Sequence, residues 1–228
     1  MTTQLLLLSS SNVHGYGFLE QPGEDIHRFF AGRRRIAFVP FALADHAGYT
    51  QTVADRFRAI DPTFDVQQID DLKDAEGIFI GGGNTFRLLK TLYERNLLQK
   101  IRDAVRNGVP YMGSSAGTVI SAPTMRTTND MPIVEPPSLD SFGFVDFQIN
   151  CHYLDPDPGG THKGETREER ILQFHEENAT PVVGIREGTL LRVEDGSATL
   201  LGIANARVFR RGREAVEVAP GTVLDAYL

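Results

Sequence analysis

The sequence is poor in cysteine, in long apolar runs and in basic charge. Its one cysteine, Cys151, excludes an internal disulfide and a thiolate metal cage, and it suits a reducing cytoplasm. The longest leucine run, residues 5–8, is far shorter than the roughly 20 apolar residues that a membrane helix needs. With 23 basic residues against 30 acidic ones, the formal net charge is -7, which argues against nucleic-acid binding. We therefore expect a cytoplasmic protein with no nucleic-acid partner and no membrane partner.

Length and composition indicate one globular domain. The chain has 228 residues, which one compact domain with insertions can accommodate. Hydrophobic residues make up 41% and charged residues 23%, so a disordered or fibrous chain is excluded. No internal repeat, low-complexity segment or linker divides the sequence. We expect a single domain over residues 1–228.

Strand-like and helix-like segments alternate in the first half of the chain. Amphipathic stretches predict helices at residues 50–60, 85–93 and 97–107. Several of the apolar runs between them lack alternation, which is typical of parallel strands covered on both faces. The predicted strands are residues 4–8, 36–41, 64–69, 77–80 and 109–112. This pattern predicts an α/β fold with a doubly wound, mostly parallel sheet flanked by helices and with ligands beyond the carboxyl ends of its strands.

The pattern changes in the second half. Residues 123–164 hold half of the 12 prolines, so we expect a long functional loop around one strand at residues 144–149. Thr166 and Glu169 form a capping box that predicts a helix extending to about Asn178. Turn signals then predict C-terminal antiparallel hairpins at a sheet edge, at Glu194-Asp195-Gly196 and Arg211-Gly212.

The strongest local signal is a small-residue turn between a predicted strand and a helical run. The turn reads Gly113-Ser114-Ser115-Ala116-Gly117. A strand, a tight turn and a helix in this order are typical of a nucleophile elbow, where glycines leave room for the turn. The elbow places the Ser115 hydroxyl at a helix N-terminus, which favours developing negative charge. Ser115 is therefore the candidate nucleophile, and the alternative is a turn that only packs the helix closely on the strand.

A second glycine-rich turn follows the predicted strand at residues 77–80. It reads Gly81-Gly82-Gly83-Asn84-Thr85, and no Gly-Lys-Ser/Thr follows, so a phosphate-binding loop is not indicated. Glycines at a strand's carboxyl end leave N–H groups exposed. We expect a donor at Gly83 that pairs with the N–H of Ala116 to form an oxyanion hole. The alternative is a tight turn in which Asn84 or Thr85 caps the next helix.

A serine nucleophile needs a base, and the chain has six histidines. His152 is preferred because it ends an apolar strand-like segment at a predicted sheet edge, and His162 is the other histidine of the long loop. Cys151 does not form a catalytic pair with His152, since consecutive strand residues point to opposite faces. The remaining histidines are expected on the surface, with the last one solvated in a charged helix: His14, His27, His46 and His175.

The base in turn needs a carboxylate that orients it and stabilises its protonated form. Glu187 follows the apolar strand at residues 181–185, and Asp130 lies in a polar loop downstream of the elbow helix. Glu187 makes the order nucleophile, histidine, acid, whereas Asp130 makes the order found in α/β-hydrolases. The residues alone leave both carboxylates open.

Six separated stretches, in the same order, resemble the peptidase E family of aspartyl dipeptidases over nearly the whole chain. They are residues 5–9, 80–89, 113–117, 126–134, 148–152 and 162–171. The resemblance implies a fold similar to class I glutamine amidotransferases. It also implies a cytoplasmic serine peptidase, without metal or cofactor, that removes an N-terminal aspartate from dipeptides. The family resemblance further implies a homodimer.

Carried over position by position, Ser115 matches the family's nucleophile and His152 its base. Glu187 stands where the family has its acid, although Arg186 replaces the family's preceding proline. Asp130 matches a family aspartate that can also serve as the acid, but the amidotransferase-like order favours Glu187. The closest alternative activity is a cyanophycinase-like peptidase of the same fold that acts on β-linked aspartyl chains. The alternative outside enzymes is a catalytically silent binding module.

Recognition of an aspartate side chain calls for a guanidinium, whose fork matches a carboxylate. Arg167 is the candidate, because it opens the helix that Thr166 caps and lies within a matched stretch. The alternative is that Arg167 only pairs with acidic neighbours on its helix. Asn84 is a second candidate for binding the substrate, followed by Lys163 and Arg170.

Overall fold

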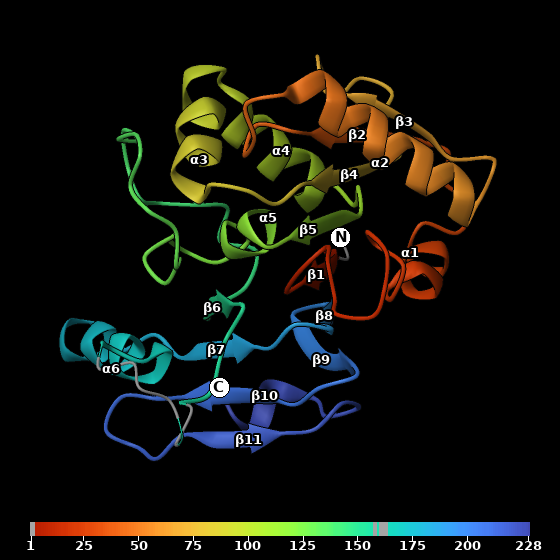
Figure 1. The fold of residues 1–228 in the computed structure, drawn as a ribbon. Coiled ribbons are helices and arrows are strands. Elements are labelled where there is room, and N and C mark those ends of the chain that lie inside the picture. Colours follow the sequence, from red (N-terminus) through yellow and green to blue (C-terminus); the bar gives the residue numbers. More distant parts are fainter. Residues whose placement is uncertain (1–2, 157–158, 160–163) are drawn as a thin grey trace.

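The computed structural model describes residues 3–156, 159 and 164–228, and within these residues the strands form two sheets (Figure 1). The larger sheet contains β1 (Gln4–Leu8), β2 (Arg35–Val39), β3 (Asp65–Gln68), β4 (Gly77–Ile80), β5 (Tyr111–Ser114), β8 (Thr189–Glu194) and β9 (Ser197–Gly202). The smaller sheet contains β6 (Gln148–Cys151), β7 (Val182–Ile185), β10 (Ala206–Phe209) and β11 (Val216–Val218). The helices are α1 (Gly23–Phe29), α2 (His46–Ile60), α3 (Thr85–Glu94), α4 (Leu97–Arg106), α5 (Ala116–Val119), α6 (Arg167–Glu177) and the 3-10 turn η1 (Leu224–Ala226).

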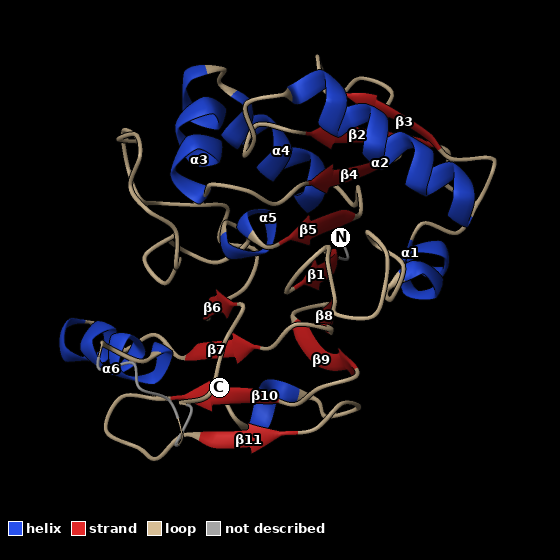
Figure 2. Cartoon of the chain, in the orientation of Figure 1, coloured by secondary structure: helices blue, strands red, loops and turns tan. Residues whose placement is uncertain are grey.

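The larger sheet has the order β3-β2-β4-β5-β1-β8-β9. Its neighbouring strands are parallel from β3 to β1, whereas β8 and β9 are antiparallel and close one edge. Helices flank the sheet in Figure 2. The predicted α/β class with a mostly parallel sheet and an antiparallel edge hairpin is confirmed.

The leucines of β1 divide between two apolar clusters on opposite faces of the larger sheet. Leu5 and Leu7 pack with residues of α3, α4 and α5, whereas Leu6 and Leu8 pack with residues of α1 and α2. Successive strand side chains point to opposite faces, so a strand covered on both faces must be apolar throughout. The burial explains why this run reads as continuous leucine rather than as an alternating pattern.

The smaller sheet was not predicted from the sequence. Within the described residues it has the order β11-β10-β7-β6, with β6 parallel to β7 and the other pairs antiparallel. The hairpin predicted around Gly212 is present as β10 and β11, but it lies in this separate sheet. The turn at Asp195 and Gly196, both with positive φ, joins β8 to β9 as predicted. Residues of both sheets share one apolar cluster.

Several element boundaries differ from those predicted. Helix α1 has no counterpart among the predicted helices. Strand β2 ends at Val39 before Pro40, and β5 begins at Tyr111 after Pro110, because proline cannot donate to the sheet's hydrogen bonds. The strand of the proline-rich region is β6, shifted toward the C-terminus, and a long connection between α5 and β6 precedes it (Figure 1). The predicted capping box at Thr166 and Glu169 is present at the start of α6.

This topology brings several strand ends to one place. The carboxyl ends of β1, β4 and β5 lie along one edge because these strands are parallel. β6 and β7 are also parallel, so the segments that follow them leave their sheet on the same side. Ligands bind at such edges in open α/β sheets.

Candidate active site

The turn after β5 holds Ser115 in a backbone conformation that few residues adopt. Ser115 has φ 49° and ψ -108°, and its N–H donates to the Leu8 carbonyl at 3.0 Å. A Cβ on Gly113 would lie 2.7 Å from the Gly117 carbonyl, and one on Gly117 would overlap the Ile80 carbonyl. Only glycine fits at both positions. Such a conformation costs on the order of 1–3 kcal/mol and persists where the surroundings determine it, as at a nucleophile elbow.

Three side chains form a hydrogen-bonded line that ends at this serine. Ser115 Oγ lies 2.9 Å from His152 Nε2, and His152 Nδ1 lies 3.0 Å from Glu187 Oε1. A carboxylate oxygen accepts hydrogen bonds, so in this arrangement Nδ1 carries the proton and Nε2 accepts from the serine hydroxyl. This arrangement allows His152 to remove the Ser115 proton while Glu187 stabilises the imidazolium.

The smaller sheet sets the distance between His152 and Glu187. His152 follows β6 and Glu187 lies two residues beyond β7, and Cys151 pairs with Ile185 in the register of these strands. His152 has φ 54°, which turns the chain out of the strand at this point. Cys151 points the other way and donates from Sγ to the Ser115 carbonyl at 3.5 Å. Burial raises the pKa of the Cys151 thiol well above its usual value, so the thiol stays protonated.

Amide donors lie beside the serine on the glycine-rich turn after β4. A Cβ on Gly82 would be 3.1 Å from Ser115 Cβ, so this turn passes directly against Ser115. The Gly82 N–H donates to the Tyr49 hydroxyl at 2.9 Å. Among the described residues, neither the Gly83 N–H nor the Ala116 N–H has an acceptor. Within the described residues, both N–H groups that the sequence predicted as oxyanion-hole donors are therefore free to bind a ligand.

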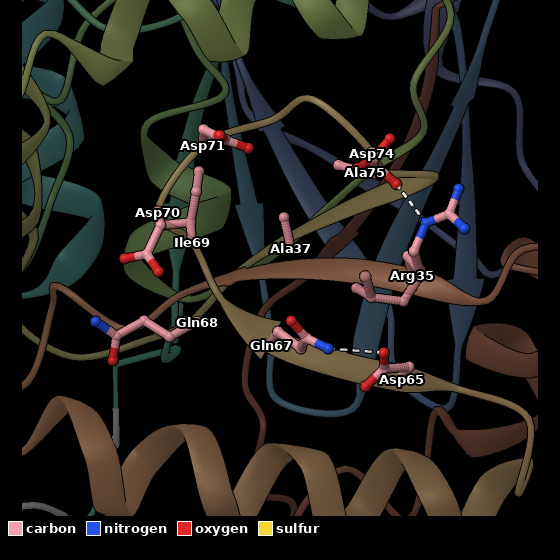
Figure 3. Close-up of a pocket in the computed structure, with 11 residues that line it drawn as sticks. Arg35, Ala37, Asp65, Gln67, Gln68, Ile69, Asp70, Asp71, Asp74 and Ala75 are labelled. Atoms are coloured by element: carbon pink, nitrogen blue, oxygen red, sulfur yellow. Dashed lines mark hydrogen bonds between the residues drawn. The ribbon is translucent and has the colours of Figure 1, made fainter.

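A cavity of about 420 Å³ opens at these groups and is lined by Ser115, His152, Gly83, Tyr49 and Asp130, among others. A second cavity, of about 380 Å³, lies against β2 and β3, and its lining includes Arg35 and four aspartates, Asp65, Asp70, Asp71 and Asp74 (Figure 3). β2 and β3 lie two and three positions from β5 in the sheet, and the lining of that cavity contains no serine, cysteine or histidine. Ser115 and His152 line the first cavity, which is therefore the candidate active site.

Asp130 forms no hydrogen bond with His152 in the structure. Asp130 Oδ2 accepts from the Thr85 N–H at 2.7 Å and from the Thr85 hydroxyl at 2.5 Å. Its Oδ1 has no hydrogen bond to a described residue, and the carboxylate lines the cavity. Asn84 caps α3 through the Arg87 N–H at 3.0 Å and donates to the Met131 carbonyl at 2.8 Å. Both residues join the start of α3 to the loop after α5.

Arg167 is the first residue of α6 and has no ion pair within the described part of the chain. Burial lowers the pKa of its guanidinium, the charge of Arg170 lowers that pKa further, and the Asp130 carboxylate raises it. The negative charge of Asp130 therefore acts on the Arg167 guanidinium, although Arg167 does not itself line the cavity. Lys163 and His162, also considered as candidates, lie outside the described residues.

The expectation that His175 is solvated is wrong. Its ring is buried against Phe174, and Nδ1 lies 3.2 Å from the Asn178 carbonyl. The charged residues around it on α6 suggested an exposed helix face, but α6 packs His175 inward. His175 has no contact with Ser115 or His152 and belongs to the packing of α6.

Two residues that form hydrogen bonds beside Ser115 and His152 were not identified from the sequence. Tyr49 comes from α2 and binds Gly82, and Ser9 accepts the His152 N–H at 3.0 Å. Ser9 begins a run of three serines directly after β1, at the carboxyl end of a parallel strand, and that position is a signal that could have found it. Tyr49 lies within a helix and carries no comparable signal.

The described residues contain no group of three or more His, Cys, Asp or Glu side chains that could hold a metal ion. Within the same residues, no helix combines the length and apolarity that crossing a membrane requires.

Comparison with known proteins supplies the family. The model of Peptidase family S51 matches residues 5–201. "Peptidase E" of Streptomyces coelicolor is 53% identical over 231 aligned residues, which cover 98% of this chain and 94% of the relative. The chain belongs to peptidase family S51. The resemblance to peptidase E that the sequence motifs indicated is confirmed, and the chain is a peptidase, a hydrolase of peptide bonds.

An animal relative and a solved structure are also similar to this chain. "Probable alpha-aspartyl dipeptidase" of Drosophila melanogaster is 47% identical to this S51 peptidase over 95% of the chain and 93% of the relative. A solved structure of a peptidase from an acI-B1 Actinobacterium superimposes with a TM-score of 0.71, covering 98% of this chain and 96% of that one. At 17% identity, the superposition shows a shared fold.

Proposed function

We propose that this S51 peptidase is a serine dipeptidase that hydrolyses dipeptides with an N-terminal aspartate through an acyl-Ser115 intermediate. The observation that carries the proposal is the line from Ser115 Oγ through His152 to Glu187, with steps of 2.9 Å and 3.0 Å at a strained elbow. The Streptomyces and Drosophila relatives, named for peptidase E and for an alpha-aspartyl dipeptidase, support the substrate class.

The proposed first step is acylation. Ser115 Oγ forms a bond to the aspartyl carbonyl carbon while its proton passes to His152 Nε2. The negative charge that develops on the carbonyl oxygen is stabilised by the N–H groups of Gly83 and Ala116. The peptide C–N bond then breaks, and His152 gives its proton to the leaving amine.

The second step releases aspartate. A water oxygen attacks the acyl carbon and loses a proton to His152 Nε2. The bond to Ser115 Oγ breaks, and His152 returns the proton to that oxygen. Glu187 accepts from His152 Nδ1–H throughout and stabilises the imidazolium in both steps.

Two charged residues suit the two charges of an N-terminal aspartate. Arg167, with no ion pair among the described residues, is proposed to bind the side-chain carboxylate. Asp130, with Oδ1 free of hydrogen bonds to the described residues at the cavity wall, is proposed to bind the α-ammonium group. Asn84 supports this pair by holding Met131, the neighbour of Asp130, against α3. A requirement for both charges explains selection of the peptide by its first residue.

The decisive experiment measures hydrolysis of Asp-Leu by the wild type and by Ser115→Ala, with labelling by a fluorophosphonate probe. We expect Ser115→Ala to fold, to lose hydrolysis and to lose labelling. Ser121→Ala is the matched control, because it removes another buried hydroxyl close to α5, which donates to the Thr118 carbonyl at 2.7 Å. Substantial Asp-Leu hydrolysis by folded Ser115→Ala protein would remove Ser115 from the mechanism. Faster hydrolysis of a β-Asp-Arg dipeptide than of Asp-Leu would instead indicate a β-aspartyl peptidase.

We also propose that the enzyme acts in the cytoplasm as a homodimer. The free, buried Cys151 is consistent with a reducing compartment, and the family resemblance supports the dimer. Exposed apolar side chains of the loop after α5, Met131 and Ile133, provide a surface that a second copy can cover. Sedimentation of the purified chain tests the dimer, and a monomer at all concentrations would exclude it.

A further inference from the structure

Tyr49 reaches from α2 to the glycine-rich turn that borders the nucleophile. Its ring contacts two other aromatic rings: the Phe38 ring lies edge-on at 5.0 Å between centroids, and the Phe18 ring lies edge-on at 6.5 Å. These contacts fix the direction of the phenol, because the ring cannot turn away without losing both of them. Burial raises the pKa of Tyr49 to about 12, so its oxygen is a neutral hydroxyl at physiological pH.

The Tyr49 hydroxyl and Ser115 both lie against the same short stretch of backbone. The hydroxyl accepts the Gly82 N–H at 2.9 Å, and a Cβ on Gly81 would lie 2.5 Å from the phenol oxygen. A Cβ on Gly82 would lie 3.1 Å from Ser115 Cβ. Tyr49 therefore holds the turn at Gly82, the residue that lies against Ser115.

The amide groups of this turn are bound on both sides of Gly83. The Gly81 N–H donates to the Val39 carbonyl at 3.2 Å, and the Asn84 N–H donates to the Ala42 carbonyl at 2.9 Å. The Gly82 N–H is held by Tyr49. Among the described residues the Gly83 N–H has no acceptor.

Three successive glycines have more backbone freedom than any other tripeptide, so their amides need external contacts to hold one direction. Gly83 has φ 132°, a value that L residues rarely adopt, and a Cβ there would lie 2.6 Å from the Ala42 carbonyl. The side chain of Tyr49 is the contact on the N-terminal side of Gly83, and the Ala42 carbonyl is the contact on its C-terminal side.

We propose that Tyr49 is a positioning residue of the oxyanion hole: by accepting the Gly82 N–H, it holds the glycine turn so that the Gly83 N–H is aimed at the oxyanion. This inference rests on the acyl-Ser115 mechanism proposed above. Preorganised donors stabilise charge in the transition state without reorganisation, and loss of one donor lowers kcat by about 10²–10³-fold. Removal of the Tyr49 hydroxyl loosens a donor rather than deleting it, so we expect a smaller loss, of about 10–100-fold.

The test compares Tyr49→Phe with the matched control Tyr93→Phe. The Tyr93 hydroxyl donates to the Asp140 carbonyl at 3.0 Å, and Tyr93 does not line the catalytic cavity. We expect Tyr49→Phe to lower kcat for Asp-Leu by about 10–100-fold with KM changed less than about twofold, since the oxyanion exists only in the transition state. Tyr93→Phe keeps the kcat and KM of the wild type.

A second readout separates positioning from a general structural role. Binding of an aspartyl aldehyde, which forms a hemiacetal oxyanion on Ser115, is expected to weaken in Tyr49→Phe by the same factor as kcat/KM. Inhibition by free aspartate is expected to stay unchanged. Active-site titration with the fluorophosphonate gives the fraction of folded enzyme in each preparation. Rates are expressed per titrated site, so the comparison stays valid when the variant is partly unfolded.

Two results would overturn the inference. One is a wild-type kcat in Tyr49→Phe, and the other is an equal weakening of the aldehyde and of free aspartate. The proposed mechanism fails separately, through hydrolysis of Asp-Leu by Ser115→Ala. An inactive Ser115→Ala together with a fully active Tyr49→Phe therefore refutes the role of Tyr49 alone.

Discussion

Ser9 and His152 are far apart in the chain and are joined by a partly buried hydrogen bond. Ser9 Oγ accepts the His152 N–H at 3.0 Å and donates to the Ile185 carbonyl at 2.8 Å. Ile185 is the last residue of β7, two positions before Glu187. One hydroxyl directly after β1 thus binds the segments that carry His152 and Glu187, at the point where His152 adopts a left-handed backbone conformation.

We expect Ser9→Ala to lower both stability and kcat. The change leaves the partly buried His152 N–H without its acceptor, which costs about 1–3 kcal/mol in free energy of unfolding, whereas the Ile185 carbonyl keeps the Tyr153 N–H. The backbone of His152 then relaxes, and its Nε2 no longer meets Ser115 Oγ in one geometry. Denaturant unfolding and steady-state kinetics measure the two effects. Ser121→Ala, which also loses a buried hydroxyl, should be destabilised with an unchanged kcat; an unchanged kcat in Ser9→Ala would contradict the prediction.

Glu187→Gln and Asp130→Asn should affect different kinetic constants. Glu187→Gln removes the charge that stabilises the His152 imidazolium, so we expect kcat to fall by about 10²–10⁴-fold with little change in KM. Asp130→Asn weakens binding of the substrate ammonium group, so KM should rise more than kcat falls. Steady-state kinetics with Asp-Leu distinguishes them. If Asp130→Asn instead removes most of kcat and leaves KM unchanged, Glu187 is not the carboxylate that stabilises the His152 imidazolium.

Arg167→Met should weaken the preference for aspartate over asparagine. A lost charged hydrogen-bond pair is worth about 1.5–3 kcal/mol, so kcat/KM for Asp-Leu relative to Asn-Leu should fall by about 10–100-fold. Arg170→Met is the control on the same helix, since Arg170 already lies 3.6 Å from the Glu165 carboxylate. Loss of the preference in Arg170→Met, with full preference retained in Arg167→Met, would move the recognition site to Arg170.

The ion pairs of Arg186 should make stability depend on pH. Arg186 donates to both Asp155 oxygens, at 2.8 Å and 2.7 Å, and to both Glu217 oxygens, at 3.0 Å and 2.8 Å. The hydrogen bonds from Arg186 lower the pKa of Asp155 below its usual value. A carboxylate with a lowered folded-state pKa stabilises the protein above its unfolded-state pKa of about 4. That stabilisation is lost as pH falls through the folded-state value.

Arg186→Met should therefore lower Tm at pH 7, and the difference from the wild type should shrink as pH falls below about 4. Thermal unfolding followed by circular dichroism measures both. Arg192→Met is the matched control, because Arg192 makes an exposed pair with Glu194 at 2.6 Å, and such pairs contribute little. A Tm difference that is the same at pH 7 and pH 3 would exclude the ion pairs as its cause.

Local features of this protein could be read from the sequence because their partners lie within a few residues. The capping box of α6 joins Thr166 to Glu169, and the elbow around Ser115 depends on glycines two positions away on either side. The leucines of β1 predicted a strand covered on both faces, since burial on both faces requires an apolar side chain at every position. Features that depend on distant partners, such as the second sheet and the burial of His175, were missed or wrong.

The sequence by itself determined that Ser115 sits on an elbow and that His152 ends a strand, since both depend on local chain geometry. The sequence left two carboxylates, Glu187 and Asp130, as candidate partners of His152, and in the tertiary structure only Glu187 reaches the His152 ring. Pairing of β6 with β7 puts Glu187 on His152 Nδ1, whereas Asp130 is held by Thr85 at the start of α3. Ser9 and Tyr49 likewise reach the site through the packing of β1 and α2. Strand register and helix docking are set by contacts across the whole core, and these contacts determine which side chains meet.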